Sequence, residues 1–298
     1  MDEPRVIGVD LGGTKILTGV VTRDGTIERR RETPTPLESQ EAVLDGLDAA
    51  VEELLDGGIA AIGFGIPSRI DHSTGRVEGS VNIPLGGVDF RERMAKRFSL
   101  PIGIENDANA ATYGEFHAGA GRNVRTMVML TLGTGCGGGA VLDGQLLRRW
   151  AEFGHMVIEF DGVPCQGTCT GRGHLESYVT GLRATALAQE EFGPAVDSHR
   201  LVRLANEGDP RAREILKGMG QRLGAGIGSL INAFDPDLVV IGGGFAAAGD
   251  FLLDPAREIV KRESLAPDKD VPIVRAELGT AAGLIGAGFI AFDAADAA

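Results

Sequence analysis

Two segments of the chain share one pattern, and this repeat limits the possible folds more than any other feature. Residues 6–25 and 127–144 each contain an apolar run, a glycine-rich turn, a second apolar run and an Asp-Gly pair. An Asp-Gly pair between apolar runs is typical of a tight β-hairpin, because both positions tolerate positive φ. Two copies this far apart predict two related domains, each opening with a hairpin that has a glycine-rich tip.

The rest of the chain alternates between strand and helix patterns. Apolar residues three or four positions apart predict helices, and short apolar runs bounded by turn residues predict buried strands. We expect helices at residues 41–56, 89–98, 107–116, 209–234 and 280–292, and further strands at residues 59–66, 102–105 and 238–241. Glycines 242–244 are expected to open another helix. This order predicts an α/β fold.

Domain boundaries follow from this organisation. We expect a small first domain at residues 1–117 and a larger second domain at residues 118–282, with an active-site cleft between them. The final helix is rich in Ala and Gly, whose small side chains allow close packing. Residues 283–298 are therefore expected to pack back on the first domain.

Charge and composition exclude several classes of protein. The 298 residues include 29 Lys and Arg against 42 Asp and Glu, and the resulting net charge of −13 repels nucleic acids and anionic membranes. No apolar run reaches the roughly 20 residues of a membrane-spanning helix, and the acidic N-terminus does not resemble a secretory signal. We expect a cytoplasmic protein with neither a nucleic-acid nor a membrane partner.

Three glycine-rich loops are candidates for binding a nucleotide. The first, Asp-Leu-Gly-Gly-Thr-Lys at residues 10–15, offers amides and a hydroxyl to a phosphate and a carboxylate to a metal ion. The second, at residues 132–139, repeats this chemistry, and the third, at residues 242–244, suits the adenosine end of a nucleotide. The spacing is not that of a Walker P-loop. The alternative for each loop is an ordinary tight turn.

A polar cluster follows the strand at residues 102–105. Asn106, Asp107 and Asn109 lie where the strand gives way to a helix, and ligands of α/β proteins bind at such carboxyl ends of strands. The alternative is helix capping by Asn106 or Asp107, but capping needs only one such residue. Three polar residues in four positions favour a site for a polyol.

Two histidines and two cysteines form a candidate metal site. His155, Cys165, Cys169 and His174 offer two nitrogens and two sulfurs, which is a closed set of ligands for a structural Zn²⁺. The alternative is a free thiol pair with His174 as a helix cap. With three cysteines in all, a disulfide framework is not expected.

Together these motifs resemble the ROK family of sugar kinases, specifically its bacterial glucokinases, within the actin-like ATPase superfamily. The resemblance covers essentially the whole chain and rests on Asp-Leu-Gly-Gly-Thr-Lys, Glu-Asn-Asp-Ala-Asn-Ala, the second glycine loop, Glu-Phe-Gly-His at residues 152–155 and the cysteine cluster. It implies two actin-like, ribonuclease H-like domains, ATP-dependent phosphorylation of a hexose, most simply glucose, Mg²⁺ and structural Zn²⁺ as cofactors, and a homodimer or homotetramer.

The resemblance also implies roles for individual residues. Asp107 corresponds to the general base that accepts the proton of the sugar 6-hydroxyl, and Asp10 to the residue that steers Mg²⁺. The implied sugar ligands are Gly65, Asn82, Asn106, Asp107, Glu152, His155 and Glu176. The implied ATP and phosphate ligands are Asp10, Gly12, Gly13, Thr14, Lys15, Thr134, Gly135, Gly243 and Gly244. The implied zinc ligands are His155, Cys165, Cys169 and His174.

Three segments depart from the family pattern. The first cysteine of the cluster is displaced, which puts Cys165 in question as a ligand, and His174 replaces the last one. Ser68 and Arg69 stand where the family has a small glycine turn, and the segment after Asn82 lacks an aromatic residue. These departures bear on which sugar is preferred more than on the reaction.

Several alternatives remain at this stage. Within the family, the substrate could be fructose, allose, N-acetylmannosamine or N-acetylglucosamine, and the donor could be polyphosphate instead of ATP. A sugar-sensing repressor would need a DNA-binding domain before the first strand, which begins near Val6. An actin-like ATPase that acts on a protein would need neither the polyol cluster nor the zinc loop.

Overall fold

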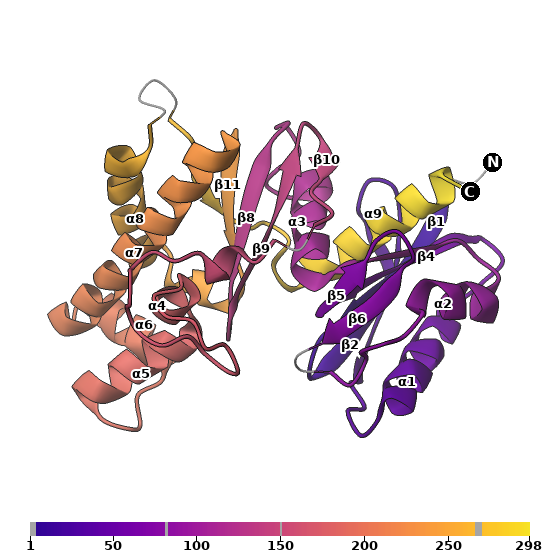
Figure 1. Ribbon diagram of the computed structural model, residues 1–298, viewed down its shortest axis with the longest axis horizontal. Helices are drawn as coiled ribbons and strands as arrows, with labels where there is room; N and C mark the ends of the chain where they lie inside the picture. Colours follow the sequence, from indigo (N-terminus) through magenta and orange to yellow (C-terminus); the bar gives the residue numbers. More distant parts are fainter. Residues whose placement is uncertain (1–3, 81–82, 150, 266–269) are drawn as a thin grey trace. The chain divides into compact units, whose positions relative to one another are not determined.

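The computed structural model describes residues 4–80, 83–149, 151–265 and 270–298 (Figure 1). The chain forms two compact units, each built on its own sheet. Unit 1 comprises Met1–Arg122, Leu146–Trp150 and Glu277–Ala298, and unit 2 comprises Asn123–Gln145 and Ala151–Ala276. The expected α/β class with two sheet-containing parts is confirmed.

The bounds of the units differ from the expected domains in three segments, of which residues 118–122 and 277–282 only shift a boundary. Leu146–Trp150 belongs to unit 1, although the sequence placed it in the second domain. Arg148 in this segment forms an ion pair with Asp293 near the C-terminus, at 2.7 Å. A long-range side-chain contact of this kind leaves no pattern in the local sequence.

Unit 1 contains a five-stranded sheet in the order β3-β2-β1-β4-β7. The strands are β1 (Arg5–Leu11), β2 (Lys15–Val21), β3 (Ile27–Pro34), β4 (Ile59–Ile66) and β7 (Ile102–Asn106). The first three are antiparallel, as the hairpin pattern predicted, whereas β4 and β7 run parallel to β1. Gly25 adopts a φ of 84° in the turn between β2 and β3, which explains the Asp-Gly pair there.

One face of this sheet carries the main apolar core of unit 1. Helices α1 (Gln40–Glu52) and α2 (Phe90–Phe98) share a buried cluster with side chains such as Ile7 and Val9 of β1. The Phe64 ring of β4 meets Phe90 edge-on, with ring centroids 5.0 Å apart. A short hairpin of β5 (Ser68–Asp71) and β6 (Arg76–Ser80), absent from the sequence-based expectations, follows β4.

The opposite face is lined with glycine. Gly8, Gly63 and Gly103 are register neighbours on β1, β4 and β7, and a Cβ on any of them would lie 1.9–2.5 Å from a backbone oxygen of α9 (Ala282–Asp296). Real Cβ atoms do not approach that closely, so this row lets the helix lie directly on the sheet. Helix α3 (Asp107–Ala118) packs on α9 through Gly114 and Gly286 in the same way.

Unit 2 contains a second five-stranded sheet, in the order β10-β9-β8-β11-β12. Its strands are β8 (Met127–Leu132), β9 (Cys136–Leu142), β10 (Gln145–Leu146), β11 (Leu238–Gly242) and β12 (Ile273–Arg275). Its α-helices are α4 (Glu176–Val179), α5 (Gly181–Phe192), α6 (Ser198–Glu207), α7 (Pro210–Phe234) and α8 (Asp250–Glu263). The second predicted hairpin is thus present as β8 and β9.

The helix expected directly after glycines 242–244 begins later. A 3₁₀ helix, η2 (Gly244–Ala248), lies between these glycines and α8. The other 3₁₀ helices of the described residues are η1 (Phe153–His155) and η3 (Gly279–Ala281). Gly243 has a φ of 84°, and a Cβ there would lie 2.3 Å from the carbonyl oxygen of Leu132. The glycines therefore form a tight turn against β8 before the chain becomes helical. Within the described residues, no helix combines the length and apolar character needed to cross a bilayer.

Candidate active site and metal centre

The parallel strands of unit 1 bring several of the predicted residues to one edge of the sheet. Asp10 is paired in register with Gly65, and the next residue of that strand, Ile66, with Asn106. These positions are at the carboxyl ends of β1, β4 and β7, where α/β proteins bind ligands. The structure thus brings Asp10, Gly65, Asn106 and Asp107 together.

Asn106 caps helix α3, and Asp107 is its first residue. The Oδ1 atom of Asn106 accepts hydrogen bonds from the backbone N–H groups of Ala108 at 3.0 Å and Asn109 at 3.3 Å. Capping therefore uses the carbonyl of the Asn106 side chain. The Asp107 carboxyl is therefore not needed for the cap.

Burial raises the pKa values of both carboxyl groups, Asp10 and Asp107. Burial raises the pKa of Asp10 to about 7, with a further rise from the charge of Asp107 and an opposing effect of Lys15. Burial also raises the pKa of Asp107, against hydrogen bonds from Ala108 and from Asn106 that lower it. Two packed carboxyl groups of this kind favour a proton or a cation beside them.

Two glycines make room for these carboxyl groups. A Cβ on Gly65 would lie 2.9 Å from the Cβ of Ala110 and 3.8 Å from the Cα of Asp107, so this glycine lets α3 approach β4. A Cβ on Gly283 would lie 2.5–2.9 Å from the carboxyl atoms of Asp10. Gly283, at the start of α9, was not among the predicted residues, because its neighbour is distant in the sequence.

The first glycine loop is a tight turn held by its own backbone. The Gly12 N–H donates to the carbonyl of Lys15 at 2.9 Å, and the Thr35 hydroxyl donates to the carbonyl of Gly12 at 2.7 Å. The Lys15 ammonium forms an ion pair with Glu32 at 3.0 Å. Gly12 thus shapes the loop, while a Cβ on Gly13 would face open space. Thr35 is a supporting residue that sequence analysis missed.

The second glycine loop, in unit 2, is held by Glu176. A carboxylate oxygen of Glu176 accepts the N–H of Cys136 at 2.7 Å, and the same oxygen would lie 2.7 Å from a Cβ on Gly135. The Gly181 N–H donates to the carbonyl of Gly133 at 2.9 Å, which ties the loop to the start of α5. Glu176 therefore fixes the loop, a role that the sequence had not suggested.

A cavity of about 540 Å³ lies beside this loop within unit 2. The second and third glycine loops line it through Gly133, Thr134 and Gly244, and α5 and α6 contribute most of the rest. Phe245 and Val202 supply apolar surface, and Ser198 and Arg203 supply polar groups. The volume is in the range of small-molecule sites.

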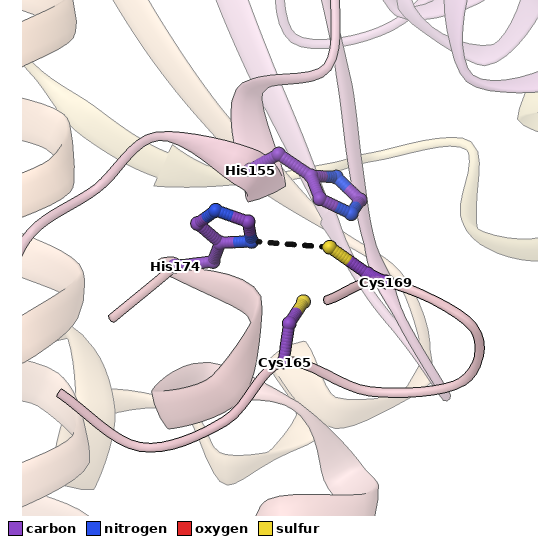
Figure 2. A group of neighbouring side chains, drawn as sticks. All are labelled: His155, Cys165, Cys169 and His174. Atoms are coloured by element: carbon purple, nitrogen blue, oxygen red, sulfur yellow. Dashed lines mark hydrogen bonds between the residues drawn. The ribbon is translucent and has the colours of Figure 1, made fainter. Parts of the chain in front are cut away.

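The predicted metal ligands come together in unit 2 (Figure 2). His155, Cys165, Cys169 and His174 each place a donor atom within 4.8 Å of the other three. The Sγ atom of Cys169 lies 3.7 Å from Nδ1 of His174. Figure 2 shows both sulfurs and both rings turned toward a common centre, so the displaced Cys165 is part of the cluster.

The donor set and its surroundings fit Zn²⁺. Donors about 2.0–2.3 Å from one ion at tetrahedral angles are about 3.3–3.8 Å apart, which matches the distance between Cys169 and His174. Among the residues that the structure describes, the buried Nδ1 atom of His155 has no hydrogen-bond partner, and a carboxylate oxygen of Glu152 is 3.5 Å away. The Gly171 N–H donates to the sulfur of Cys169 at 3.4 Å.

The remaining predicted positions have different outcomes. Asn82 lies outside the described residues. Ser68 is buried, and within the described residues its hydroxyl has no hydrogen-bond partner, whereas Arg69 is exposed and pairs with Glu78 at 2.6 Å. Gly243 is a turn residue, as described above.

Comparison with known proteins agrees with the motifs over nearly the whole chain. Residues 6–294 match the ROK family. The chain is 34% identical to a glucokinase of Streptomyces coelicolor over 96% of each chain, and 35% identical to a glucokinase of Thermotoga maritima over 87% of this chain and 88% of that one. It is 30% identical to an N-acetyl-D-glucosamine kinase of Shigella boydii over 95% and 98%.

Solved structures show the same likeness. A ROK family glucokinase from Streptomyces griseus, in complex with glucose and AMPPNP, has a TM-score of 0.82 and 31% identity, covering 97% of this chain and 99% of that one. A ROK hexokinase from Thermus thermophilus has a TM-score of 0.84 and 34% identity, covering 99% and 100%. The residues at the sheet edge, the glycine loops and these comparisons agree, and the chain belongs to the ROK family.

Proposed function

We propose that this protein is a kinase that transfers the γ-phosphoryl group of ATP to the 6-hydroxyl of glucose. The observation that carries the proposal is Asp107, a packed carboxyl at the first residue of α3 whose pKa is raised above its ordinary value. A raised pKa makes the carboxylate a stronger base, and a base beside the attacking hydroxyl is what the reaction requires. The glucokinases among its relatives support this choice of reaction.

In unit 1, Asp107 would accept the proton of the 6-hydroxyl as the oxygen attacks phosphorus. The side-chain NH₂ of Asn106 would donate to a neighbouring sugar hydroxyl, because its carbonyl is already used as the helix cap. Gly65, whose missing Cβ lets α3 approach β4, and Asn82 are proposed as further sugar ligands. Neutral groups would thus position the sugar, and one carboxyl would accept the proton.

The phosphates of ATP would bind the glycine loops. Gly13 and Thr14 in the first loop, and Thr134 and Gly135 in the second, would donate amides and hydroxyls, with Gly12 shaping the turn. Lys15 would add charge after leaving Glu32. The cavity beside Thr134 and Gly244 would hold the adenosine end, with Gly243 forming its turn.

Two metal ions complete the proposal. Asp10 would hold Mg²⁺, which supplies charge neutralisation to the phosphates. His155, Cys165, Cys169 and His174 would hold a structural Zn²⁺ that fixes the loop between η1 and α4. Glu152, His155 and Glu176 are further proposed as sugar ligands, because they flank this loop.

The test is ADP release with Mg²⁺-ATP across a panel of hexoses and N-acetylhexosamines. Glucose should give the highest kcat/KM, and Asp107→Asn should lower kcat by about 10² or more while sugar affinity changes far less. Asp209→Asn, at the N-cap of α7, is the matched control and should keep normal turnover. Near-normal turnover of Asp107→Asn would refute its role as base.

The same panel addresses the second candidate substrate class. N-acetylglucosamine is the second candidate because the chain is similar to an N-acetyl-D-glucosamine kinase. Preference for an N-acetylhexosamine would keep the mechanism and change the substrate. Polyphosphate in place of ATP tests the donor in the same assay.

We also infer a homodimer or homotetramer. Phe160 and Val157 are 96% and 61% exposed, which is unusual for large apolar side chains and supports contact with a second chain. Light scattering of the purified protein tests this, and a monomer at micromolar concentration would contradict it.

A further inference from the structure

Two cavities of unit 2 meet at three side chains that have no part in the proposed reaction. One cavity, of about 440 Å³, is lined by α5 and α7, and the other, of about 380 Å³, is bordered by the loop at residues 159–172. Tyr178, Arg183 and Arg222 line both. None of the residues proposed for sugar, nucleotide or metal lines either cavity.

The arginines around this junction differ in whether a carboxylate neutralises them. Arg211 pairs with Glu191 at 3.1 Å, and Arg172 pairs with Asp161 at 2.7 Å. Within the described part of the chain, neither Arg183 nor Arg222 forms an ion pair with a carboxylate. Among the described residues, the guanidinium groups of Arg183 and Arg222 therefore have no carboxylate partner where the two cavities meet.

Arg222 is held in place without losing its charge. Its guanidinium carbon lies 5.2 Å from the centroid of the Tyr178 ring, and its Nη1 donates to the carbonyl of Gly218 at 3.1 Å. The Tyr178 hydroxyl in turn accepts the N–H of Val163 at 2.9 Å. The aromatic ring fixes the direction of the guanidinium, and its remaining N–H groups are free to bind an anion.

The local charge is less negative than that of the chain. Together the two cavities are lined by four arginines and four acidic residues, in a protein whose net charge is −13. The larger cavity also has an apolar wall formed by Leu187, Ile215 and Met219. Arginine pairs are suited to phosphoryl oxygens, and an apolar wall beside them suits the organic part of an ester.

We propose that this junction binds the phosphoryl group of a small phosphate monoester. Arg183 and Arg222 are the two guanidinium donors to the phosphoryl oxygens, and the organic part of the ester lies in the groove between α5 and α7. Inorganic phosphate shares the phosphoryl chemistry and would use the same two arginines without the groove.

The site is connected to the second glycine loop through a short stretch of chain. Tyr178 and Arg183 flank Gly181, whose N–H donates to the carbonyl of Gly133, and they follow Glu176, which holds Cys136. A ligand that fixes Arg183 therefore also steadies this loop. This consequence rests on the proposed function, whereas binding itself does not.

Calorimetric titration tests the binding, with inorganic phosphate and phenyl phosphate as probes and Mg²⁺-ADP present to fill the nucleotide site. Arg183→Ala and Arg222→Ala should each raise the Kd at least about tenfold, the equivalent of 1.4 kcal/mol. Arg200→Ala on α6, where the arginine pairs with Glu207, is the matched control and should leave the Kd unchanged. Equal melting temperatures verify that the variants are folded.

The comparison of probes distinguishes the two sources. Tighter binding of phenyl phosphate supports an ester with an organic part, and equal binding supports free phosphate as the occupant. The proposal is overturned if neither probe shows saturable binding, or if the double variant binds as the unsubstituted protein does.

In the kinase assay, phenyl phosphate should change the KM for ATP only when both arginines are present. Binding without this change would refute the link to the loop alone, and an inactive enzyme would refute the proposed function while leaving the binding test intact.

Discussion

Glu115 and Leu278 are 163 residues apart in the sequence, and a carboxylate oxygen of Glu115 accepts the backbone N–H of Leu278 at 2.7 Å. The other oxygen accepts the N–H groups of Glu277 at 3.1 Å and Ala120 at 3.0 Å. Glu115 itself is fully buried in unit 1. Apart from Leu146–Trp150, the chain leaves this unit after Arg122 and returns at Glu277, so one carboxylate ties together the two segments that flank unit 2 in the sequence.

Replacing Glu115 should therefore destabilise the protein more than replacing an exposed glutamate does. Glu115→Ala removes the acceptor of three N–H groups, and we expect the free energy of unfolding to fall by about 2–4 kcal/mol. Glu115→Gln keeps one acceptor oxygen and should cost about half as much. Urea unfolding monitored by circular dichroism measures both.

The control for this prediction is Glu41→Ala, at an exposed position in the first turn of α1, which should change stability by at most about 0.5 kcal/mol. If Glu115→Ala were as mild as that control, the carboxylate would not be the anchor that its hydrogen bonds suggest.

Local patterns were sufficient for the elements that carry the site. The Asp-Gly hairpins, the strand before Asn106 and the helix after it depend on neighbours in sequence, and they are where the sequence placed them. The four metal-site residues also come together, because the loop that carries them folds within about 20 residues.

Features that depend on long-range register could not be predicted in this way. Gly8, Gly63 and Gly103 become a row only when three strands align, and Gly283 matters only because α9 returns to β1. Glu115 resembles a surface residue of a helix until its distant partners are known. The β5 and β6 strands have four and five residues, too few to show an alternating pattern.

The raised pKa of Asp10 predicts how stability depends on pH. Its pKa is about 7 in the folded protein against an ordinary value of 3.8, so the folded state favours the protonated form. The contribution of Asp10 to the free energy of unfolding is fully present below about pH 4 and is lost as the pH rises through 7. The loss is at most about 4 kcal/mol. Urea unfolding without divalent cations at pH 5, 6, 7 and 8 measures the slope.

Asp10→Asn should flatten that slope, because the amide cannot ionise. Asp24→Asn is the control, since hydrogen bonds from Thr22 and Thr26 lower the pKa of Asp24 and keep it ionised throughout this range. If the free energy of unfolding depended on pH in the same way for Asp10→Asn and the unsubstituted protein, the pKa of Asp10 would not be raised in the folded state.

The glycine row predicts a sharp position dependence of Gly→Ala substitutions. A Cβ on Gly63 would lie 1.9 Å from the carbonyl oxygen of Ala287, so Gly63→Ala must push α9 away from the sheet. We expect a loss of about 3 kcal/mol or an insoluble protein. Gly57→Ala is the control, because a Cβ there meets nothing within 4 Å. Thermal melting compares the two, and equal melting temperatures would contradict the close packing of α9.

The metal cluster predicts the composition of the purified protein. Two thiols and two imidazoles around one point bind Zn²⁺ tightly, so elemental analysis should find about one zinc per chain. Removing it with a chelator should lower the melting temperature, because the ion would join both ends of the loop between η1 and α4 to its middle. The backbone pairings of this loop include the short bridges Val157 to His174 and Pro164 to Arg172.

Cys165→Ser separates the metal site from the alternative of a free thiol pair. Loss of a ligand should lower the zinc content well below one per chain, whereas Cys136→Ala removes the cysteine outside the cluster and should leave the content unchanged. Equal zinc in both variants would exclude Cys165 as a ligand. A metal-free protein of undiminished stability would instead favour the thiol pair, since His155 and His174 would then meet only as neighbouring rings with centroids 5.1 Å apart.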